Sequence, residues 1–149
     1  MTKRRATGSY EVQRTTGSHE VLDRLFVYGT MRQGQTARSL VANSIVRCEQ
    51  ASAKGAIFAF PMGYPGFSDQ GAGRVVGECL WLSTAELPAT FGLLDAYEGE
   101  DFARVITQIK LASGVEHWAW IYALSDPSAV RFGTPIEDGD WVRYWNEQG

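Results

Sequence analysis

The chain has 149 residues, 44% of them hydrophobic, which suits one domain with a substantial core and argues against overall disorder. Its 14 basic and 17 acidic residues give a net charge of −3, which argues against a basic surface for nucleic acid. No apolar run approaches the roughly 18 residues of a membrane span, and the N-terminus lacks the apolar core of a signal peptide. We therefore expect a cytoplasmic protein with no nucleic acid and no membrane partner.

Residues 1–21 are predicted to be a flexible N-terminal tail, and residues 22–149 to be the folded domain. The first twenty residues are polar, carry Lys3, Arg4 and Arg5, and show no periodic apolar stripe. This composition favours a solvated extension over an arm that binds a partner or a targeting receptor.

Residues 25–27 predict a short buried strand that runs directly into a glycine-bearing loop. Gly29 permits backbone torsions or close approaches that a side chain would forbid. A helix-compatible segment, residues 35–41, follows the loop, so several backbone N–H groups are expected to converge near it. Such a concavity suits a carboxylate or an oxyanion.

Residues 45–48 and 56–60 have the character of two strands, which a hairpin could join. Residues 61–73 contain two prolines and four glycines, a composition that predicts a long irregular loop. The aromatic residues Tyr64 and Phe67 in this loop fit either a pocket wall or a plug at one end of the core.

Residues 74–82 return to strand character, with Glu78 in the middle. Strict alternation places Glu78 on one face with Val76 and Leu80. A solvated sheet edge is favoured for this acid over a cavity.

A helix is predicted after residue 82. Ser83 and Glu86 match a capping box, although Pro88 favours a restart of the helix with the proline in its first turn. Leu87, Phe91 and Leu94 then step along one face as the core stripe.

Glu98 continues the stripe of this helix, and Gly99 is a natural helix-ending residue. Burial and the negative end of the helix dipole both disfavour the charged carboxylate, so we predict a raised pKa for Glu98, as in a general acid or base. The alternative is that the helix frays before Glu98 and its side chain turns to water.

The last third predicts strands at residues 102–111 and 115–124, joined by a hairpin turn at residues 112–114. Trp141, Tyr144 and Trp145 are expected to pack back on the sheet. His117 is expected to be a sheet or surface residue, because no metal-ligand spacing accompanies it.

The two cysteines, Cys48 and Cys79, have no metal-binding or redox spacing. Plain core or strand thiols are favoured over a disulfide.

Two distant segments, residues 28–31 (Tyr-Gly-Thr-Met) and 94–99 (Leu-Asp-Ala-Tyr-Glu-Gly), resemble the hallmark segments of the gamma-glutamylcyclotransferase-like superfamily. Four further pieces agree with this resemblance in order along the chain: Tyr64-Pro65, Val76-Gly77-Glu78, Phe102-Ala103-Arg104 and Gly139-Asp140-Trp141. The chain looks most like the compact branch that includes gamma-glutamylamine cyclotransferases and avirulence-induced-gene-like proteins. Met31 and Phe102 stand where leucine and tyrosine are more usual in the family.

The resemblance implies an α+β fold, a small mixed β-barrel with flanking helices. It also implies an enzyme of the transferase or lyase class that releases 5-oxoproline from a gamma-glutamyl amine or amino acid, with no metal and no cofactor. Glu98 would be the general base and acid. The substrate-binding residues implied are Tyr28, Gly29, Thr30, Met31, Tyr64, Phe102 and Arg104.

Two other functions remain open at the level of sequence. The first is a non-catalytic small-molecule binding protein that keeps the family pocket. The second is an interaction protein that uses its basic N-terminal tail. These motifs leave the departing amine and the oligomeric state open.

Overall fold

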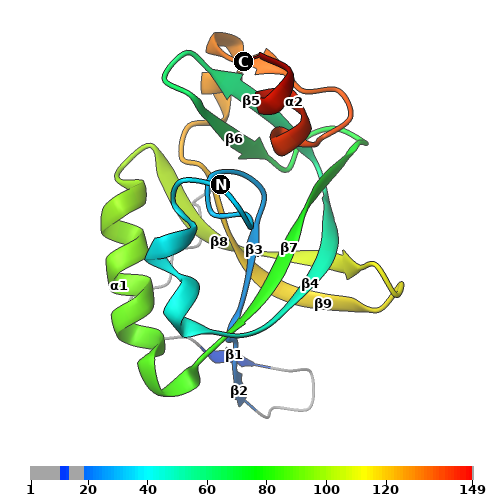
Figure 1. Cartoon of the computed structure of the whole chain (residues 1–149). Helices are drawn as coiled ribbons and strands as arrows, with labels where there is room; N and C mark the ends of the chain where they lie inside the picture. Colours follow the sequence, from blue (N-terminus) through cyan, green and yellow to red (C-terminus); the bar gives the residue numbers. More distant parts are fainter. Residues whose placement is uncertain (1–10, 14–18, 149) are drawn as a thin grey trace.

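The computed structural model describes residues 11–13 and 19–148, and its centre is a small closed barrel of five strands (Figure 1). The strand order is β9, β3, β7, β4 and β8, and β8 pairs again with β9 to close the ring. The β3–β9 pair is parallel and the other four pairs are antiparallel. The barrel strands are β3 (Arg24–Val27), β4 (Ile45–Lys54), β7 (Arg74–Leu82), β8 (Phe102–Leu111) and β9 (Glu116–Leu124). The predicted mixed barrel is confirmed.

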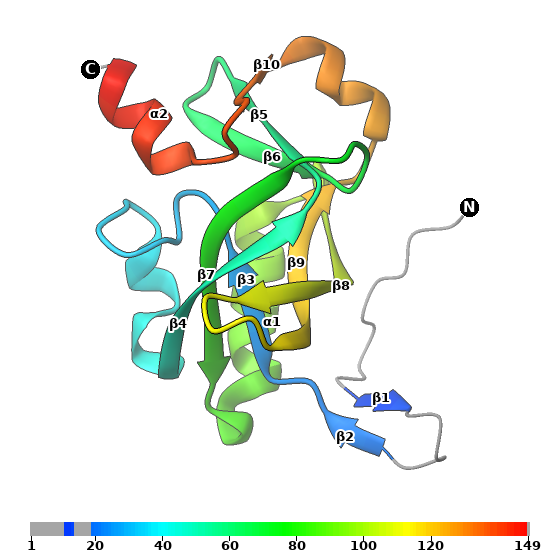
Figure 2. The same cartoon turned by 90° about the vertical axis from the view of Figure 1, so that its right-hand side faces the viewer.

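Three further strands extend the sheet at one end of the barrel, where Figure 2 shows them above β9 together with the C-terminal helix. They are β6 (Tyr64–Ser68), which pairs with β9 in parallel, β5 (Ala56–Phe60) and β10 (Thr134–Pro135). The prediction of an irregular loop over residues 61–73 is therefore wrong at its centre. Pro65 is tolerated because the contact of β6 with β9 is made at Phe67, beyond the proline.

The predicted hairpin between residues 45–48 and 56–60 is also wrong. Strand β4 continues to Lys54 and pairs with β7 and β8, whereas β5 pairs with β6 and β10. The hairpin of β8 and β9 is confirmed, with Lys110 opposite Glu116.

Two α-helices flank the sheet: α1 (Leu87–Glu98) and α2 (Trp141–Gln148). The Ser83 side chain makes no capping hydrogen bond, and α1 begins after a 3₁₀ turn, η3 (Thr84–Glu86), with Pro88 in its first turn. The segment of residues 35–41, whose sequence is compatible with a helix, forms turns that lead into the 3₁₀ segments η1 (Arg38–Leu40) and η2 (Ala42–Ser44). A fourth 3₁₀ segment is η4 (Pro127–Phe132).

The barrel has one core inside it and a second core between its wall and α1. Leu25 and Val27 of β3 belong to the outer core, whereas Phe26 between them belongs to the inner core. The same alternation runs along β9, since both faces of these two strands are covered. The predicted stripe of Leu87, Phe91 and Leu94 is fully buried in the outer core, which explains why α1 lies along the barrel wall (Figure 1).

Part of the predicted N-terminal tail forms a two-stranded antiparallel sheet of β1 (Glu11–Gln13) and β2 (His19–Val21). Residues 1–10 and 14–18 of that predicted tail lie outside the described residues. Among the helices that the structure describes, none combines the length and the apolar character needed to cross a membrane.

Candidate functional site

A cavity of about 560 Å³ opens where the loop after β3, the turn before β6 and the end of α1 meet. Seven of the eight site residues predicted from the sequence line it, and Arg104 is the exception. The lining residues are Phe26, Val27, Tyr28, Gly29, Thr30, Met31, Thr36, Met62, Gly63, Tyr64, Pro65, Tyr97, Glu98, Asp101, Phe102 and Tyr122. The two hallmark segments therefore share one cavity, although about seventy positions separate them in the chain.

The loop after β3 is folded tightly by its own backbone. The Arg32 N–H donates to the Gly29 carbonyl at 3.0 Å, and the Ala37 N–H donates to the Thr30 carbonyl at 2.8 Å. None of the hydrogen bonds found among the described residues uses the N–H of Gly29, Thr30 or Met31 as its donor. All three residues line the cavity, and successive N–H groups without a protein acceptor are the kind of backbone feature that binds a ligand oxygen.

Gly29 is required for space and not for an unusual backbone torsion. A Cβ built on Gly29 would lie 2.5 Å from Cγ of Pro65 in β6, and Gly29 is not among the glycines with positive φ. The loop and β6 can approach this closely only because residue 29 has no side chain.

Tyr28 lines the cavity, and its side chain belongs to the core inside the barrel. The hydroxyl donates to the Tyr122 carbonyl at 2.6 Å and accepts from the Phe67 N–H at 3.2 Å. Burial raises the pKa of Tyr28 well above its ordinary value, and the negative charge of Glu98 acts in the same direction. The side chain therefore ties β6 and β9 to the start of the loop as a neutral phenol.

Glu78 binds the loop after β3 through its side chain. The prediction that this side chain lies at a solvated sheet edge is therefore wrong. Its side chain is 3% exposed, and both carboxylate oxygens accept from the Gln33 N–H at 3.1 and 3.2 Å. The Arg38 guanidinium donates to Glu78 Oε1 at 2.5 Å and to the Met31 carbonyl at 3.2 Å. The buried charge is thereby paired and hydrogen-bonded. The signal in the sequence was a carboxylate in the middle of an apolar strand.

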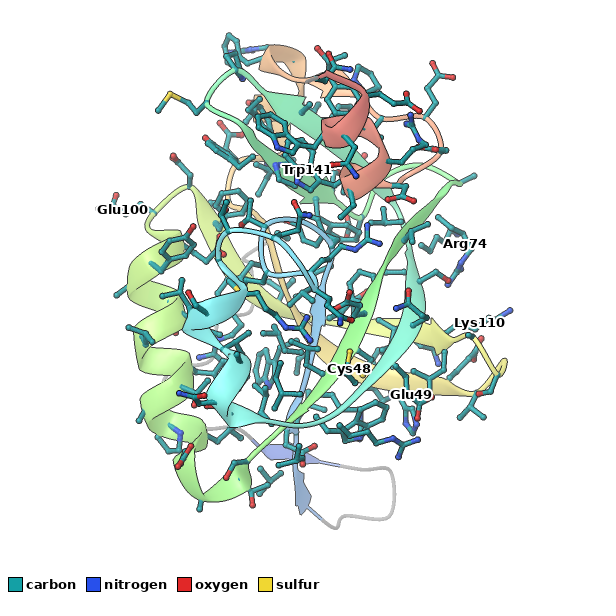
Figure 3. The ribbon with its side chains drawn as sticks, viewed as in Figure 1. Cys48, Glu49, Arg74, Glu100, Lys110 and Trp141 are labelled. Atoms are coloured by element: carbon teal, nitrogen blue, oxygen red, sulfur yellow. The ribbon has the colours of Figure 1, made fainter. Side chains whose placement is uncertain are left out.

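Glu98 is the last residue of α1 and faces the cavity. Its pKa is raised to about 7, mostly by loss of contact with water and in smaller part by the negative charge of the nearby Asp95 carboxylate. The predicted upward shift is confirmed, and the alternative of a helix that frays before Glu98 is wrong. By contrast, the labelled Glu100 points away from the end of α1 in Figure 3 and is exposed.

Arg104, predicted to bind substrate, lies beneath α1 with 2% of its surface exposed. Its guanidinium donates to the two Asp95 oxygens at 2.9 and 3.0 Å and stacks over the rings of Phe91 and Trp120. The Tyr122 hydroxyl also donates to Asp95, at 2.7 Å. Sequence reasoning missed Asp95 and Tyr122, and the available signal was the three-residue spacing that puts Asp95 on the same helix face as Glu98.

The opposite wall of the cavity is aromatic. The Tyr64 ring contacts the Phe102 ring edge-on at 5.9 Å and stacks on the Phe60 ring at 5.7 Å. Tyr64 is therefore a pocket residue, whereas its sequence neighbour Phe67 is buried in the barrel interior.

Neither cysteine is in a disulfide: Cys79 is buried and Cys48 is exposed at the outer face of β4. Within residues 11–13 and 19–148, no group of three or more histidine, cysteine, aspartate and glutamate side chains is placed to hold a metal ion.

Residues 25–143 match the family described as gamma-glutamyl cyclotransferase, AIG2-like, and the chain belongs to this family. Membership supports a cyclotransferase-type activity in general terms. A comparison with curated proteins gave no significant sequence match.

Solved structures with the same fold include YkqA from Bacillus subtilis, at 25% identity and a TM-score of 0.67 over 86% of this chain. The chain spans 42% of the length of YkqA. An uncharacterised protein from Pyrococcus horikoshii, PH0828, matches at 19% identity and a TM-score of 0.61, covering 84% of this chain and 94% of its own. An AIG2-like protein from Mus musculus matches at 16% identity and a TM-score of 0.61, covering 78% and 86%.

Substitution of Gly29 by alanine tests the close approach of the loop to β6. The added methyl would overlap Pro65 and force the loop or β6 to move, so we expect Gly29→Ala to lose about 1–3 kcal/mol of unfolding free energy in urea titrations. The control is Gly92→Ala in α1, where an added methyl meets nothing within 4 Å and helix propensity predicts a small gain. Equal stability of the two variants would contradict the steric argument.

The raised pKa of Glu98 predicts a pH-dependent stability effect. Because the carboxyl ionises at about 4.5 in the unfolded chain and about 7 in the folded one, its ionisation costs folding free energy as the pH rises through this window. Relative to wild type, Glu98→Gln should therefore gain on the order of 1–3 kcal/mol on going from pH 4 to pH 8, measured by denaturation.

The matched control for this measurement is Glu100→Gln, which removes an exposed carboxylate two residues further along. A stability difference between wild type and Glu98→Gln that is the same at both pH values would show that Glu98 is not buried as described.

Proposed function

We propose that the protein is a cyclotransferase that releases 5-oxoproline from a gamma-glutamyl amine or gamma-glutamyl amino acid. One observation supports this more than any other: Glu98, with a pKa of about 7, shares a cavity with the three N–H groups of Gly29, Thr30 and Met31. A base and an oxyanion-binding loop on one cavity are the parts that an intramolecular acyl transfer needs.

Glu98 acts first as a base. The α-ammonium of the glutamyl group is not nucleophilic until it loses a proton. A carboxylate with a pKa near 7 is a stronger base than an ordinary glutamate, and a substantial fraction of it is still ionised at neutral pH and able to accept that proton. A positioned base of this kind typically contributes about 10²- to 10⁴-fold to the rate.

The freed amine then attacks the δ-carbonyl carbon of its own side chain. The new N–C bond closes a five-membered lactam, and the ring nitrogen gives up its second proton to solvent. The C–N bond to the departing amine breaks as Glu98 passes the first proton to that amine, which leaves as RNH2 and takes up a proton from solvent as an ammonium ion. The N–H groups of the loop stabilise the negative charge that develops on the carbonyl oxygen. Because nucleophile and electrophile belong to one molecule, the cavity has only to hold the glutamyl chain bent.

Residues that do not touch the reacting atoms support this chemistry by shaping the cavity and by holding Glu98 and the loop in position. Tyr64 and Phe102 exclude water from one side of the cavity. Arg104 holds Asp95, and thereby the last turns of α1, so that Glu98 is presented at a fixed place. Glu78 does the same for the loop through the Gln33 N–H.

A panel of gamma-glutamyl amines and amino acids, assayed for 5-oxoproline by chromatography, tests the proposal. We expect release from at least one compound, and a loss of about 10²-fold or more in kcat for Glu98→Gln, because glutamine cannot accept the proton. Glu100→Gln is the matched control and should retain wild-type activity. No release from any compound, with tight binding that Glu98→Gln leaves unchanged, would assign the cavity to a binding protein.

Asp95 sets the working pH of the proposed base. Its negative charge raises the pKa of Glu98, so Asp95→Asn should shift the acidic limb of the pH profile of kcat/KM to lower pH. The asparagine oxygen can still accept the Tyr122 hydrogen bond, and the Arg104 charge left behind acts in the same direction. An acidic limb at wild-type pH or above would contradict the assignment of that limb to Glu98.

A further inference from the structure

A second, smaller cavity lies beside the first, under α2. Its volume is about 260 Å³, and the described residues that line it are Ala59, Phe60, Pro61, Gly63, Phe132, Thr134, Trp141, Tyr144, Trp145 and Gln148. None of these ten carries a formal charge, and five are aromatic. We call this cavity the aromatic groove.

The aromatic groove exposes side chains that usually avoid water. Phe132 is 66% exposed and Trp145 46% exposed, so the prediction that Trp145 packs on the sheet holds only for one of its faces. That face stacks on Trp141, whose ring lies 5.2 Å away and whose side chain is buried at the base of α2 (Figure 3). The rigid inner wall and the exposed outer rings form a surface suited to a flat apolar group.

The aromatic groove adjoins the proposed catalytic cavity across a single turn. Gly63 lines both cavities, and Phe60 of the groove stacks on Tyr64 of the catalytic cavity. Trp145 packs on this turn, because a Cβ built on Gly63 would lie 3.3 Å from its ring. The absence of a side chain at Gly63 keeps the wall between the cavities low.

The volume of the aromatic groove indicates that it would hold only part of a ligand. Pockets that take a whole drug-sized molecule measure about 300–1,000 Å³, so 260 Å³ suits a fragment such as one ring system. A substrate held by its glutamyl end near Glu98 must extend its departing amine out of the catalytic cavity. Gly63 lines both cavities, so an amine that extends past Gly63 reaches the aromatic groove.

Resting on the proposed function, we propose that the aromatic groove is the leaving-group subsite, and that the preferred substrates are gamma-glutamyl derivatives of amines or amino acids bearing an uncharged aromatic ring. The ring packs against Trp145 and against the side of Phe132 that the Arg131 guanidinium does not cover, and it loses its contact with water. Its binding energy orients the scissile amide relative to Glu98.

The experiment compares two substrates, gamma-glutamyl-phenylalanine and gamma-glutamyl-alanine, which differ only by the phenyl ring. We expect kcat/KM to be at least about tenfold higher for the phenylalanine compound, mostly through KM, since burial of a ring contributes roughly that much. Trp145→Ala and, separately, Phe132→Ala should reduce this preference severalfold, measured as the ratio of kcat/KM for the two compounds.

Trp118→Ala is the matched control, because Trp118 is a tryptophan of nearly the same exposure, 47%, on β9 and lines neither cavity. It should leave the preference intact.

Three outcomes overturn the proposal. Equal kcat/KM for the two substrates, with 5-oxoproline released from both, rejects the subsite while the proposed function stands. No 5-oxoproline from either substrate or from the wider panel rejects both. A dimer in light scattering that Trp145→Ala converts to a monomer assigns the groove to a second copy of the chain.

Discussion

The site depends first on the ion pair of buried Arg104 with partly exposed Asp95, which joins the only long helix of the described residues to the barrel. Both hydrogen bonds of the guanidinium to the carboxylate are near 3 Å, and two aromatic rings cover the cation. Removal of Asp95 would leave the buried guanidinium without this carboxylate, a loss that costs about 3–5 kcal/mol in fully buried pairs and less here because Asp95 is partly exposed. The pair fixes how the end of α1 approaches the barrel. It also keeps a negative charge one helical turn from Glu98, which makes that acid a weaker one.

Glu78 and Glu98 are both glutamates near the loop after β3, but they differ in role: Glu78 is structural, and Glu98 is the proposed base. Glu78 lies opposite Val27 and has a guanidinium and a backbone N–H as partners, so its charge is held in place and used for anchoring. Glu98 has a carboxylate as its electrostatic neighbour and lines the open cavity. The structural carboxylate, Glu78, is buried and paired with a cation, whereas the proposed proton-transferring carboxylate, Glu98, is only partly buried and has another carboxylate beside it.

The parts of this architecture visible in the sequence were those that depend on short-range periodicity. The apolar stripe of α1 gave the face that Glu98 continues, and the upward shift of its pKa followed from that face and from burial. The β8–β9 hairpin followed from two strand-like runs joined at a glycine.

The parts that could not be predicted depend on partners distant in the chain. Glu78 was expected in solvent because Arg38, forty residues earlier, gives no local sign that it will reach the acid. Strand β6 was hidden by Pro65 and by glycines whose role is close packing. Arg104 was predicted to bind substrate, but in the structure its guanidinium forms an ion pair with Asp95. Knowledge of the fold was needed to pair these charges correctly.

Strand β9 has a consequence for the order in which the molecule assembles. It contacts three neighbours in turn, β8 by an antiparallel pairing and then β3 and β6 by parallel ones, so it closes the barrel and carries the extension. The Tyr28 hydroxyl that steadies the loop reaches a β9 carbonyl 94 positions later. Such distant pairings have a high entropic cost of closure and form slowly. A ribosome must therefore have delivered most of the chain before the cavity can exist, and until then the apolar faces of β3 and β7 have no cover and need protection from aggregation.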